Sequence, residues 1–188
     1  MIQKAIKTAA ILLMLSTPAS ASALVDAAKD AENFADNGKS VDAILAMDSA
    51  VGKLWDKLPL TFIDALFVKE RPNSYGGYEP RKDNVFRSGE DMILYTELAG
   101  FGYGRDGDHF TISLNADMEV LSADGKVLAK REDFLKFNNR SRVPNREYFA
   151  VFVYNFDGIA PGNYTIRTRL KDQNSDRISH VDTAIVVK

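Results

Sequence analysis

One stretch in the second half of the chain alternates strictly between apolar and polar side chains. Between His109 and Leu121, the apolar positions are Phe110, Ile112, Leu114, Ala116, Met118 and Val120. A period of two places successive side chains on opposite faces of a β-strand. The pattern therefore predicts a long strand with one face in a core and one face toward water. Such a strand requires a sheet that packs against a second layer.

Other segments around this strand also have strand patterns. They are Asp91–Leu98, Lys126–Lys130, Glu147–Asp157, Tyr164–Leu170 and Ile178–Val187, with a short strand near Val85–Arg87. Ser88-Gly89, Asp124-Gly125 and Pro161-Gly162 supply turns between them. About seven short strands separated by regular turn signals are typical of an antiparallel β-sandwich.

The end of the chain carries a more specific pattern. Gly162-Asn163-Tyr164 opens a strand, a polar turn follows at Lys171-Asp172, and the last strand is rich in valine. This order resembles the closing F–G hairpin of bacterial immunoglobulin-like domains. The resemblance implies an immunoglobulin-like sandwich over residues 83–188 and implies no activity, because a fold does not define a function.

The region before the strands predicts a helical hairpin over residues 24–70. In the first helix, Leu24, Ala27, Ala28, Ala31, Phe34 and Ala35 share one face. Asn37-Gly38 ends this helix, Ser40 caps a second one, and Pro59 limits it. The apolar segment Phe62–Val68 is expected to belong to the helical part and to dock it on the sandwich. Residues 71–82, rich in Pro and Gly, are expected to form a linker.

The spacing of three small residues in this hairpin follows a known repeat. Gly38, Ala43 and Ala50 stand where a tetratricopeptide repeat has its turn glycine and its two small packing residues. The hairpin therefore resembles a single tetratricopeptide unit, although Trp55 occupies the position of the repeat's proline. Two interpretations follow: a peptide-binding groove, or an ordinary helical hairpin that covers one side of the sandwich.

The N-terminus has the features of a secretory signal peptide, residues 1–23. Lys4 and Lys7 form a positive n-region, Ala9–Leu15 an apolar region, and Ala21-Ser22-Ala23 a cleavage site. Cleavage is expected after Ala23, or after Ala21. The apolar region is too short for a membrane span, which needs roughly 20 residues.

Composition narrows the classes of protein further. The chain has no cysteine, which excludes disulfides, thiol catalysis, cysteine-ligated zinc and iron–sulfur sites. The net charge is −2, and removal of Lys4 and Lys7 with the signal peptide makes it −4. This charge gives no general attraction to nucleic acid or anionic lipid. An exported, cysteine-free chain of this kind resembles the small periplasmic proteins of Gram-negative bacteria.

Two loops rich in glycine and aromatic residues are the candidate contact surface. They are Tyr75-Gly76-Gly77-Tyr78 and Phe101-Gly102-Tyr103-Gly104-Arg105. Tyrosine and arginine are favoured at binding hot spots. The predicted binding residues are Tyr75, Tyr78, Arg81, Phe101, Tyr103 and Arg105. In the alternative interpretation, the rings pack into the rim of the sandwich.

Motifs for catalysis and metal binding are missing from the sequence. His109 and His180 are the only histidines, and neither Gly-x-Ser-x-Gly nor His-Glu-x-x-His occurs. Asp106-Gly107-Asp108 lacks the further ligands of a calcium loop. No catalytic, metal-binding or cofactor-binding residue is predicted. Glu97 is expected to form a structural ion pair with an arginine such as Arg146 or Arg167.

These observations favour a non-catalytic binding or adaptor protein of the periplasm. The expected partner is another envelope protein or a peptide or glycan ligand, with no nucleic acid and no membrane span. Two alternatives stay open: a carboxylate-based envelope hydrolase, and a secreted effector or inhibitor.

Overall fold

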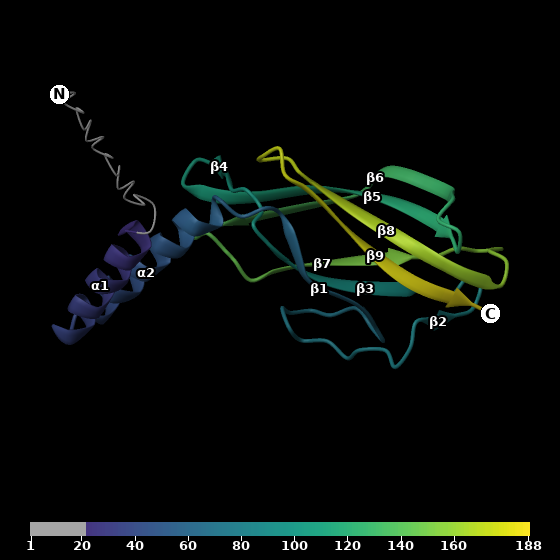
Figure 1. The fold of residues 1–188 in the computed structure, drawn as a ribbon, viewed down its shortest axis with the longest axis horizontal. Helices are drawn as coiled ribbons and strands as arrows, with labels where there is room; N and C mark the ends of the chain where they lie inside the picture. Colours follow the sequence, from purple (N-terminus) through teal and green to yellow (C-terminus); the bar gives the residue numbers. More distant parts are fainter. Residues whose placement is uncertain (1–21) are drawn as a thin grey trace, which may run out of the picture. The chain divides into compact units, whose positions relative to one another are not determined.

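The computed structural model describes residues 22–188, so most of the predicted signal peptide lies outside the described residues. The chain divides into two compact units, one up to Gly52 and one from Lys53 onward. Two helices come first and antiparallel β-sheets follow (Figure 1). The predicted α+β class is confirmed: a helical hairpin followed by an immunoglobulin-like β-sandwich. In the described part of the chain, no helix is long and apolar enough to cross a membrane.

The first unit is the helical hairpin. Helix α1 (Ser22–Asp36) and helix α2 (Ser40–Trp55) run antiparallel (Figure 1). Gly38 has a φ of 71° at the turn between them, a conformation that glycine adopts without strain. Ala31 and Ala50 are the most deeply buried residues of the two helices.

The second unit is the sandwich, which has two sheets. One sheet is antiparallel, in the order β1 (Thr61–Val68), β3 (Met92–Ala99) and β7 (Tyr148–Tyr154). The other has the order β2-β9-β8-β5-β4, with β6 paired to β5. Its strands are β2 (Val85–Phe86), β4 (Gly104–Asp106), β5 (His109–Ser122), β6 (Val127–Ser141), β8 (Gly162–Asp172) and β9 (Ile178–Val187). Among the strands of residues 22–188, only β2 and β9 pair in parallel.

Alternate residues of both sheets fill the core between them. Leu114 and Ala116 of β5 are fully buried, as the alternating pattern predicts. From the facing sheet, Leu94 and Leu98 of β3 and Phe152 of β7 are buried in the same cluster. The predicted closing hairpin is also confirmed, because β8 and β9 pair antiparallel over their length.

The structure corrects the prediction for residues 61–68. They form strand β1, which pairs with β3 from Thr61 opposite Ala99 to Val68 opposite Ile93. The helical prediction was wrong because a short apolar run has no period that distinguishes a helix from a buried strand. As a result, the expected linker at residues 71–82 connects β1 to β2 within the sandwich. Strand β4 and the second half of β6 were also missed.

Candidate functional site

The outer face of the β1-β3-β7 sheet gathers aromatic and acidic side chains. Tyr95 and Glu97 point outward from β3, because their neighbours Leu94, Thr96 and Leu98 are buried in the core. Across the strands, Glu97 lies opposite Asp64 of β1 and opposite Phe149 of β7. Together with two tyrosines of the following loop, these residues form a surface that we call the tyrosine face: Asp64, Tyr75, Tyr78, Tyr95, Glu97 and Phe149.

The loop after β1 brings Tyr75 and Tyr78 to this face. The chain leaves β1 and returns beside it, because the amide of Lys69 donates to the carbonyl of Glu79 at 2.9 Å. Gly76 has a φ of 67°, and its amide donates to the Tyr95 hydroxyl at 2.8 Å. The ring of Tyr78 lies 4.4 Å from the ring of Tyr95. The loop and Phe149, whose ring stacks 5.5 Å from that of Tyr95, leave Tyr95 with no exposed surface.

The tyrosine hydroxyls donate hydrogen bonds to the two carboxylates. Tyr95 Oη donates to Glu97 Oε1 at 2.8 Å, and Tyr75 is hydrogen-bonded to the same carboxylate. Tyr78 Oη donates to Asp64 Oδ2 at 3.2 Å. Glu97 was expected to form an ion pair with Arg146 or Arg167. That expectation is wrong for Arg167, which pairs with Glu119 and Asp182 on the other sheet.

Burial and the carboxylates both raise the pKa of these tyrosines. Burial is the largest cause for Tyr75, Tyr78 and Tyr95, and the neighbouring carboxylates add to it because they oppose a phenolate. The hydroxyls therefore stay protonated and act as donors at neutral pH. Among the described residues, neither Asp64 nor Glu97 forms an ion pair with a lysine or arginine. The face thus holds two half-buried acids through neutral donors alone.

This arrangement has the chemistry to bind an organic cation. Aromatic rings attract a cation through their π-electrons, and carboxylates accept charge-assisted hydrogen bonds from it. Phe149, Tyr75 and Tyr78 are half-buried, so parts of their rings remain accessible. In the described part of the chain, no three acidic or histidine side chains converge as a metal site would require.

Phe101, a predicted binding residue, lies in the core instead. It has no exposed surface, and its carbonyl accepts a hydrogen bond from Trp55 Nε1 at 2.8 Å. Its ring packs edge-on against Trp55 and Tyr148, at 5.1 and 5.5 Å. Tyr103 is half-buried beside it and donates from its hydroxyl to the carbonyl of Asn145. Prediction of Phe101 as a contact residue was wrong, because an aromatic ring next to glycines fills the sandwich rim as readily as it faces a partner.

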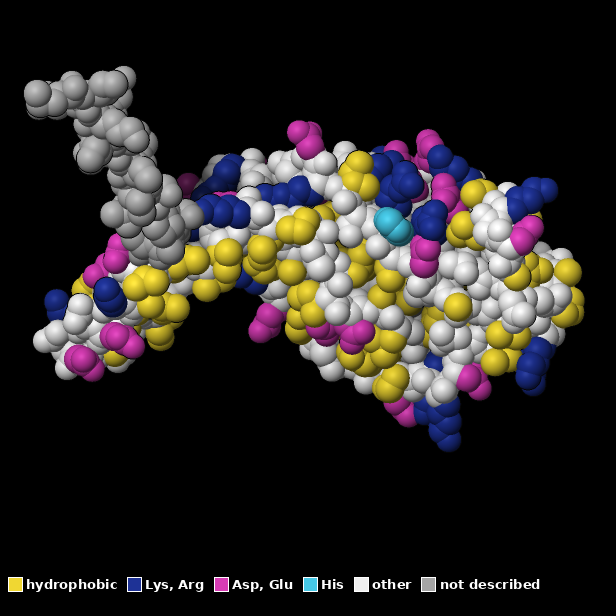
Figure 2. Space-filling model, in the orientation of Figure 1, with side chains coloured by type: hydrophobic (Ala, Val, Ile, Leu, Met, Phe, Trp, Pro, Cys, Tyr) yellow, Lys and Arg dark blue, Asp and Glu magenta, His cyan; other side chains and the backbone are white. Residues whose placement is uncertain are grey.

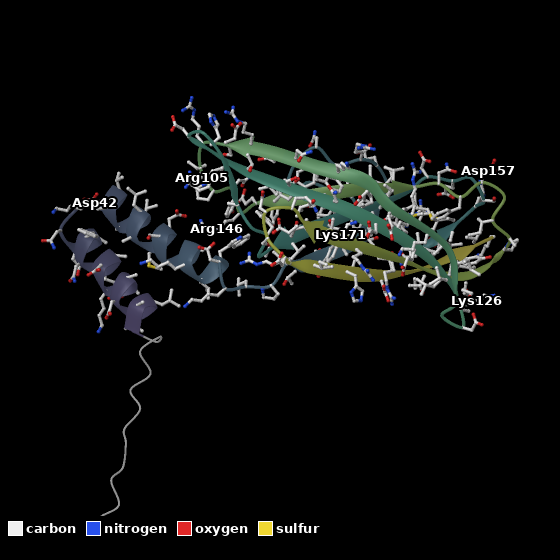
Figure 3. All side chains as sticks on the ribbon, turned by 90° about the horizontal axis from the view of Figure 1, so that it is seen from above. Asp42, Arg105, Lys126, Arg146, Asp157 and Lys171 are labelled. Atoms are coloured by element: carbon white, nitrogen blue, oxygen red, sulfur yellow. The ribbon has the colours of Figure 1, made fainter. Side chains whose placement is uncertain are left out.

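Arg105 is the exposed member of the same loop. Its guanidinium lies 3.5 Å from the centre of the Phe110 ring, a cation–π contact on the β4–β5 pair. Figure 3 shows Arg105 at one end of the sandwich, with Lys126 and Asp157 at the other. The two predicted loops do not form one surface: Tyr78 packs on outward-facing Tyr95, whereas Phe101 packs on Tyr148, which faces the core.

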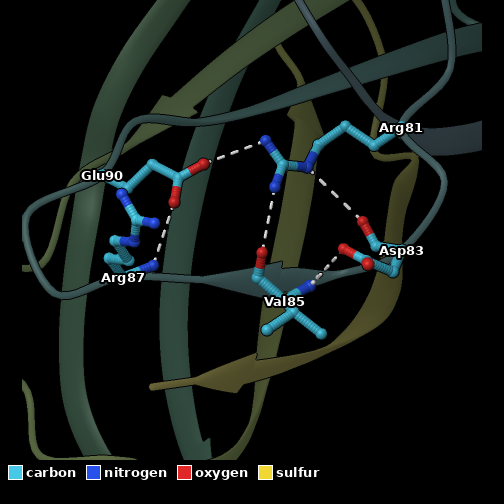
Figure 4. A network of polar contacts seen from close by, with 5 residues as sticks. All are labelled: Arg81, Asp83, Val85, Arg87 and Glu90. Atoms are coloured by element: carbon cyan, nitrogen blue, oxygen red, sulfur yellow. Dashed lines mark hydrogen bonds and ion pairs between the residues drawn. The ribbon is translucent and has the colours of Figure 1, made fainter.

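Arg81 is held in a network inside the sandwich unit (Figure 4). Its guanidinium donates to Glu90 Oε1 and to the carbonyl of Val85, both at 2.9 Å. It also lies 4.3 Å from the ring centre of Phe86. Glu90 in turn accepts from the amide of Arg87 at 3.0 Å. These contacts fix the start of β2, so the structure places Arg81 in a supporting role.

Four members of the tyrosine face were not predicted as binding residues: Asp64, Tyr95, Glu97 and Phe149. Asp64 was missed because its strand was assigned to the helical part. Tyr95 and Glu97 alternate with buried residues, and that signal was visible in the sequence. The contact of Phe149 with Tyr95 depends on the β3–β7 register, which the sequence does not specify.

Comparison with known proteins finds no matching family model and no matching curated protein. Solved structures of similar fold do exist. A Niemann-Pick type C2 protein from Japanese carpenter ant is 7% identical in sequence, with a TM-score of 0.40. The match covers 70% of this chain and 94% of the ant protein. The CARDB domain of the PF1109 protein from Pyrococcus furiosus is 13% identical, with a TM-score of 0.33, and the match covers 70% of this chain and 93% of that domain. The sporulation control protein Spo0M from Bacillus subtilis is 12% identical, with a TM-score of 0.36, and the match covers 70% of this chain and 50% of Spo0M. These similarities concern the fold alone.

Proposed function

We propose that this protein is a non-catalytic binding or adaptor protein of a bacterial cell envelope, with the tyrosine face as its contact surface. The partner presents a lysine or arginine side chain, on another envelope protein or on a peptide. One observation carries the proposal: two half-buried carboxylates, Asp64 and Glu97, lie among aromatic rings without a cation from the described chain.

The energetic argument rests on partial burial. A carboxylate that leaves water without an opposite charge is costly, and the cost falls when a cation supplies charge-assisted hydrogen bonds. Tyr75, Tyr78 and Tyr95 already hold the carboxylates in place, so little side-chain entropy is lost on binding. A guanidinium or ammonium group is therefore the ligand chemistry that this surface favours.

The place of action and the hairpin are further parts of the proposal. The charged, apolar and small-residue regions of the N-terminus, together with the lack of cysteine, support export to the periplasm. The helix pair α1–α2 resembles a single tetratricopeptide unit in the spacing of Gly38, Ala43 and Ala50. N-terminal sequencing of the native protein tests the export step, and a sequence that starts at Met1 would contradict it.

A carboxylate-based hydrolase is the weaker alternative. The acids of a glycosidase flank the scissile bond from two sides. Asp64 and Glu97 instead lie next to each other on one sheet surface, and tyrosine hydroxyls occupy part of their acceptor capacity. A binding role fits this arrangement better than acid–base chemistry.

The test compares two charge-matched double variants. Asp64→Asn with Glu97→Gln removes both charges from the tyrosine face and keeps the shape of the side chains. Asp182→Asn with Glu119→Gln makes the same changes on the outer face of the other sheet. Binding of a fluorescent lysine- and arginine-rich peptide is measured by anisotropy, with a glutamate-rich peptide of equal length as a second probe.

The proposal expects the basic peptide to bind the unaltered protein and the acidic peptide not to bind. The Asp64/Glu97 variant should bind the basic peptide at least about tenfold more weakly, which corresponds to roughly 1.4 kcal/mol. The Glu119/Asp182 variant should bind it as the unaltered protein does. An equal loss of affinity in both variants would mean that net charge alone explains the binding, and it would reject the tyrosine face as the site.

A further inference from the structure

Strand β7 lies at the edge of the β1-β3-β7 sheet, and its sequence is unusual for an edge strand. Among residues 22–188, β7 pairs with β3 on one side and with no strand on the other. Every second residue of such a strand directs its amide and its carbonyl away from the sheet. The sequence of β7, Tyr-Phe-Ala-Val-Phe-Val-Tyr, contains no charge, no proline and no glycine. A segment of this composition with unpaired backbone groups readily pairs with a further strand.

The opposite edge of the same sheet, β1, is protected against such pairing. Its register with β3 shifts at a bulge between Phe62 and Asp64. The amide of Ala65 donates to Asp64 Oδ1 at 2.8 Å, so a side chain of β1 itself already occupies this donor. Further along, the amide of Arg81 donates to the carbonyl of Phe67 at 2.9 Å. Bulges and covering loops are the devices that keep other chains away from an edge.

The edge strands of the other sheet are protected by charge or by short length. Within the described chain, β6 pairs only with β5, and Asp133 in it has a φ of 47°. The charged residues of β6 are Lys130, Arg131, Glu132, Asp133, Lys136 and Arg140. Figure 2 shows such a mixture of basic and acidic side chains on the side of the sandwich that it presents. Strands β2 and β4 have two and three residues. Of the edge strands in residues 22–188, β7 is therefore the one that lacks protection.

We propose that the partner of the tyrosine face is an extended peptide segment that binds as a fourth strand on the free edge of β7, with lysine or arginine at alternate positions. This inference rests on the proposed function, because the added strand supplies the cation that the tyrosine face accepts. Main-chain hydrogen bonds to β7 provide affinity, and alternate side chains provide specificity. Those alternate side chains lie on the same outer face as Phe149 and Glu97.

The start of β7 has the charge that a basic strand requires. Glu147 directly precedes β7, is exposed, and lies close enough to Tyr75 to raise the pKa of that tyrosine. Glu97 lies opposite Phe149 on β3. A basic residue opposite Phe149 on the added strand has its backbone two strand spacings, about 10 Å, from Glu97. A lysine or arginine side chain, together with that of the glutamate, can span this distance across the Phe149 ring.

A second copy of β7 would fill the edge without supplying this charge. The outward side chains of β7 are Phe149, Val151 and Val153, all apolar and half-buried. Pairing of β7 with β7 of another copy would therefore bring no lysine or arginine from that strand to Glu97. A peptide with alternating basic residues satisfies the backbone groups of the edge and the carboxylates of the face together.

N-methylation of a peptide tests strand addition. The probe is a fluorescent peptide of about eight residues, a common strand length, in which lysine alternates with valine. One derivative is N-methylated at every lysine amide and the other at every valine amide, so both keep the charge and the side chains. A strand on an edge uses the N–H groups of every second residue. We expect one derivative to bind the full protein at least about tenfold more weakly in anisotropy, and the other to bind within about twofold of the unmodified peptide.

The outcomes separate this inference from the proposed function. Equal affinity of the two derivatives would overturn strand addition. If the unmodified peptide then still loses affinity for the Asp64→Asn/Glu97→Gln variant, the proposed function stands and the peptide binds by charge alone. If neither this peptide nor the lysine- and arginine-rich one binds, the proposed function fails as well. A protein that sediments as a dimer and binds no alternating peptide would assign the edge to a second copy and would overturn the inference.

Hydrogen exchange of backbone amides, followed by NMR, locates the added strand. In the free protein, alternate amides between Tyr148 and Tyr154 should exchange rapidly, because they face no strand. The unmodified peptide should slow their exchange at least about tenfold and leave the edge amides of β6 unchanged. Glu147→Gln should weaken peptide binding about threefold, whereas Asp124→Asn, at the exposed β5–β6 turn, should not. Protection of β6 in place of β7, or equal effects of the two variants, would overturn the assignment to β7.

Discussion

The two outer faces of the sandwich hold their carboxylates in different ways. On the β2-β9-β8-β5-β4 sheet, Arg167 donates to both oxygens of Asp182 at 2.8 Å. On the same face, Lys171 contacts Asp117 and Asp133, each at 2.7 Å. These acids thus find a cation within the chain. On the tyrosine face, Asp64 and Glu97 accept hydrogen bonds from neutral donors instead: tyrosine hydroxyls and, for Asp64, the backbone amide of Ala65.

This difference separates a face whose carboxylates are already paired with cations of the chain from a face whose carboxylates can accept a cation from a partner. Cross-strand ion pairs neutralise the first surface, and its residues gain little from a charged partner. The tyrosine face keeps its negative charge, and its rings are stacked in place by the β1–β2 loop. The comparison also explains why net charge alone is a poor guide here: the acids are distributed over both faces, but only one face leaves them without a cation.

The largest expected contrast comes from truncation of one side chain on each face. Tyr95→Ala removes a ring that has no exposed surface and supports Tyr78 and Phe149. We expect a loss of about 3 to 5 kcal/mol in the free energy of unfolding, as for other buried aromatic residues. Arg167→Ala should cost about 1 kcal/mol or less, because its pairs are exposed to water. Urea unfolding followed by circular dichroism measures the stability of both variants. Equal losses of stability would contradict the claim that Tyr95 is buried and that the ion pairs of Arg167 are exposed to water.

Alkaline pH should destabilise the sandwich through its buried tyrosines, on both sides of the β1-β3-β7 sheet. Burial raises the pKa of Tyr148 to about 12, and burial also raises the pKa of Tyr95 and Tyr154. A tyrosine with a raised folded-state pKa contributes its full stability below the unfolded value of about 10. That contribution disappears as pH rises through the folded-state pKa. For Tyr148 alone the loss is roughly 2 to 3 kcal/mol.

Absorbance of tyrosinate near 295 nm gives the measurement for this alkaline transition. The buried tyrosines should ionise above pH 11, together with the loss of tertiary structure. Tyr95→Phe serves as the control, since it removes one high-pKa group and keeps the ring. Ionisation of all tyrosines near pH 10 without unfolding would show that the rings are not buried as described.

The sandwich was largely predictable from local patterns, and the tyrosine face was not. Alternation from Phe110 to Val120 predicts strand β5, and the turn at Asp124-Gly125 predicts its hairpin with β6. Local sequence carries this information because a strand's two faces repeat every second residue. By contrast, the contact of Tyr78 with Tyr95 depends on how the loop after β1 folds back. That path is a tertiary property, set by hydrogen bonds such as Lys69 to Glu79.

The candidate residues divide along the same line. Tyr75 and Tyr78 were selected as rigid aromatic residues beside glycines, and they lie on the candidate site. Phe101 was selected on the same grounds and is buried. The two loops have similar sequences, so local sequence could not separate them. What separates them is that Phe101 meets Trp55 and Tyr148 at the rim of the core.

The smallest expected effect concerns the outer face of the β2-β9-β8-β5-β4 sheet. It tests whether the ion pairs on that face stabilise its carboxylates. Lys171→Met removes the cation from Asp117, whose side chain is only 10% exposed, while the backbone amide of Asp133 still donates to it. We expect a loss of about 1 to 2 kcal/mol, more than for Arg167→Met, because a buried acid without a counter-charge is costly and an exposed acid is hydrated. Urea unfolding of the two methionine variants measures the difference. If Lys171→Met is no more destabilising than Arg167→Met, hydrogen bonding to the backbone alone holds Asp117, and the two outer faces rely on neutral donors to a similar degree.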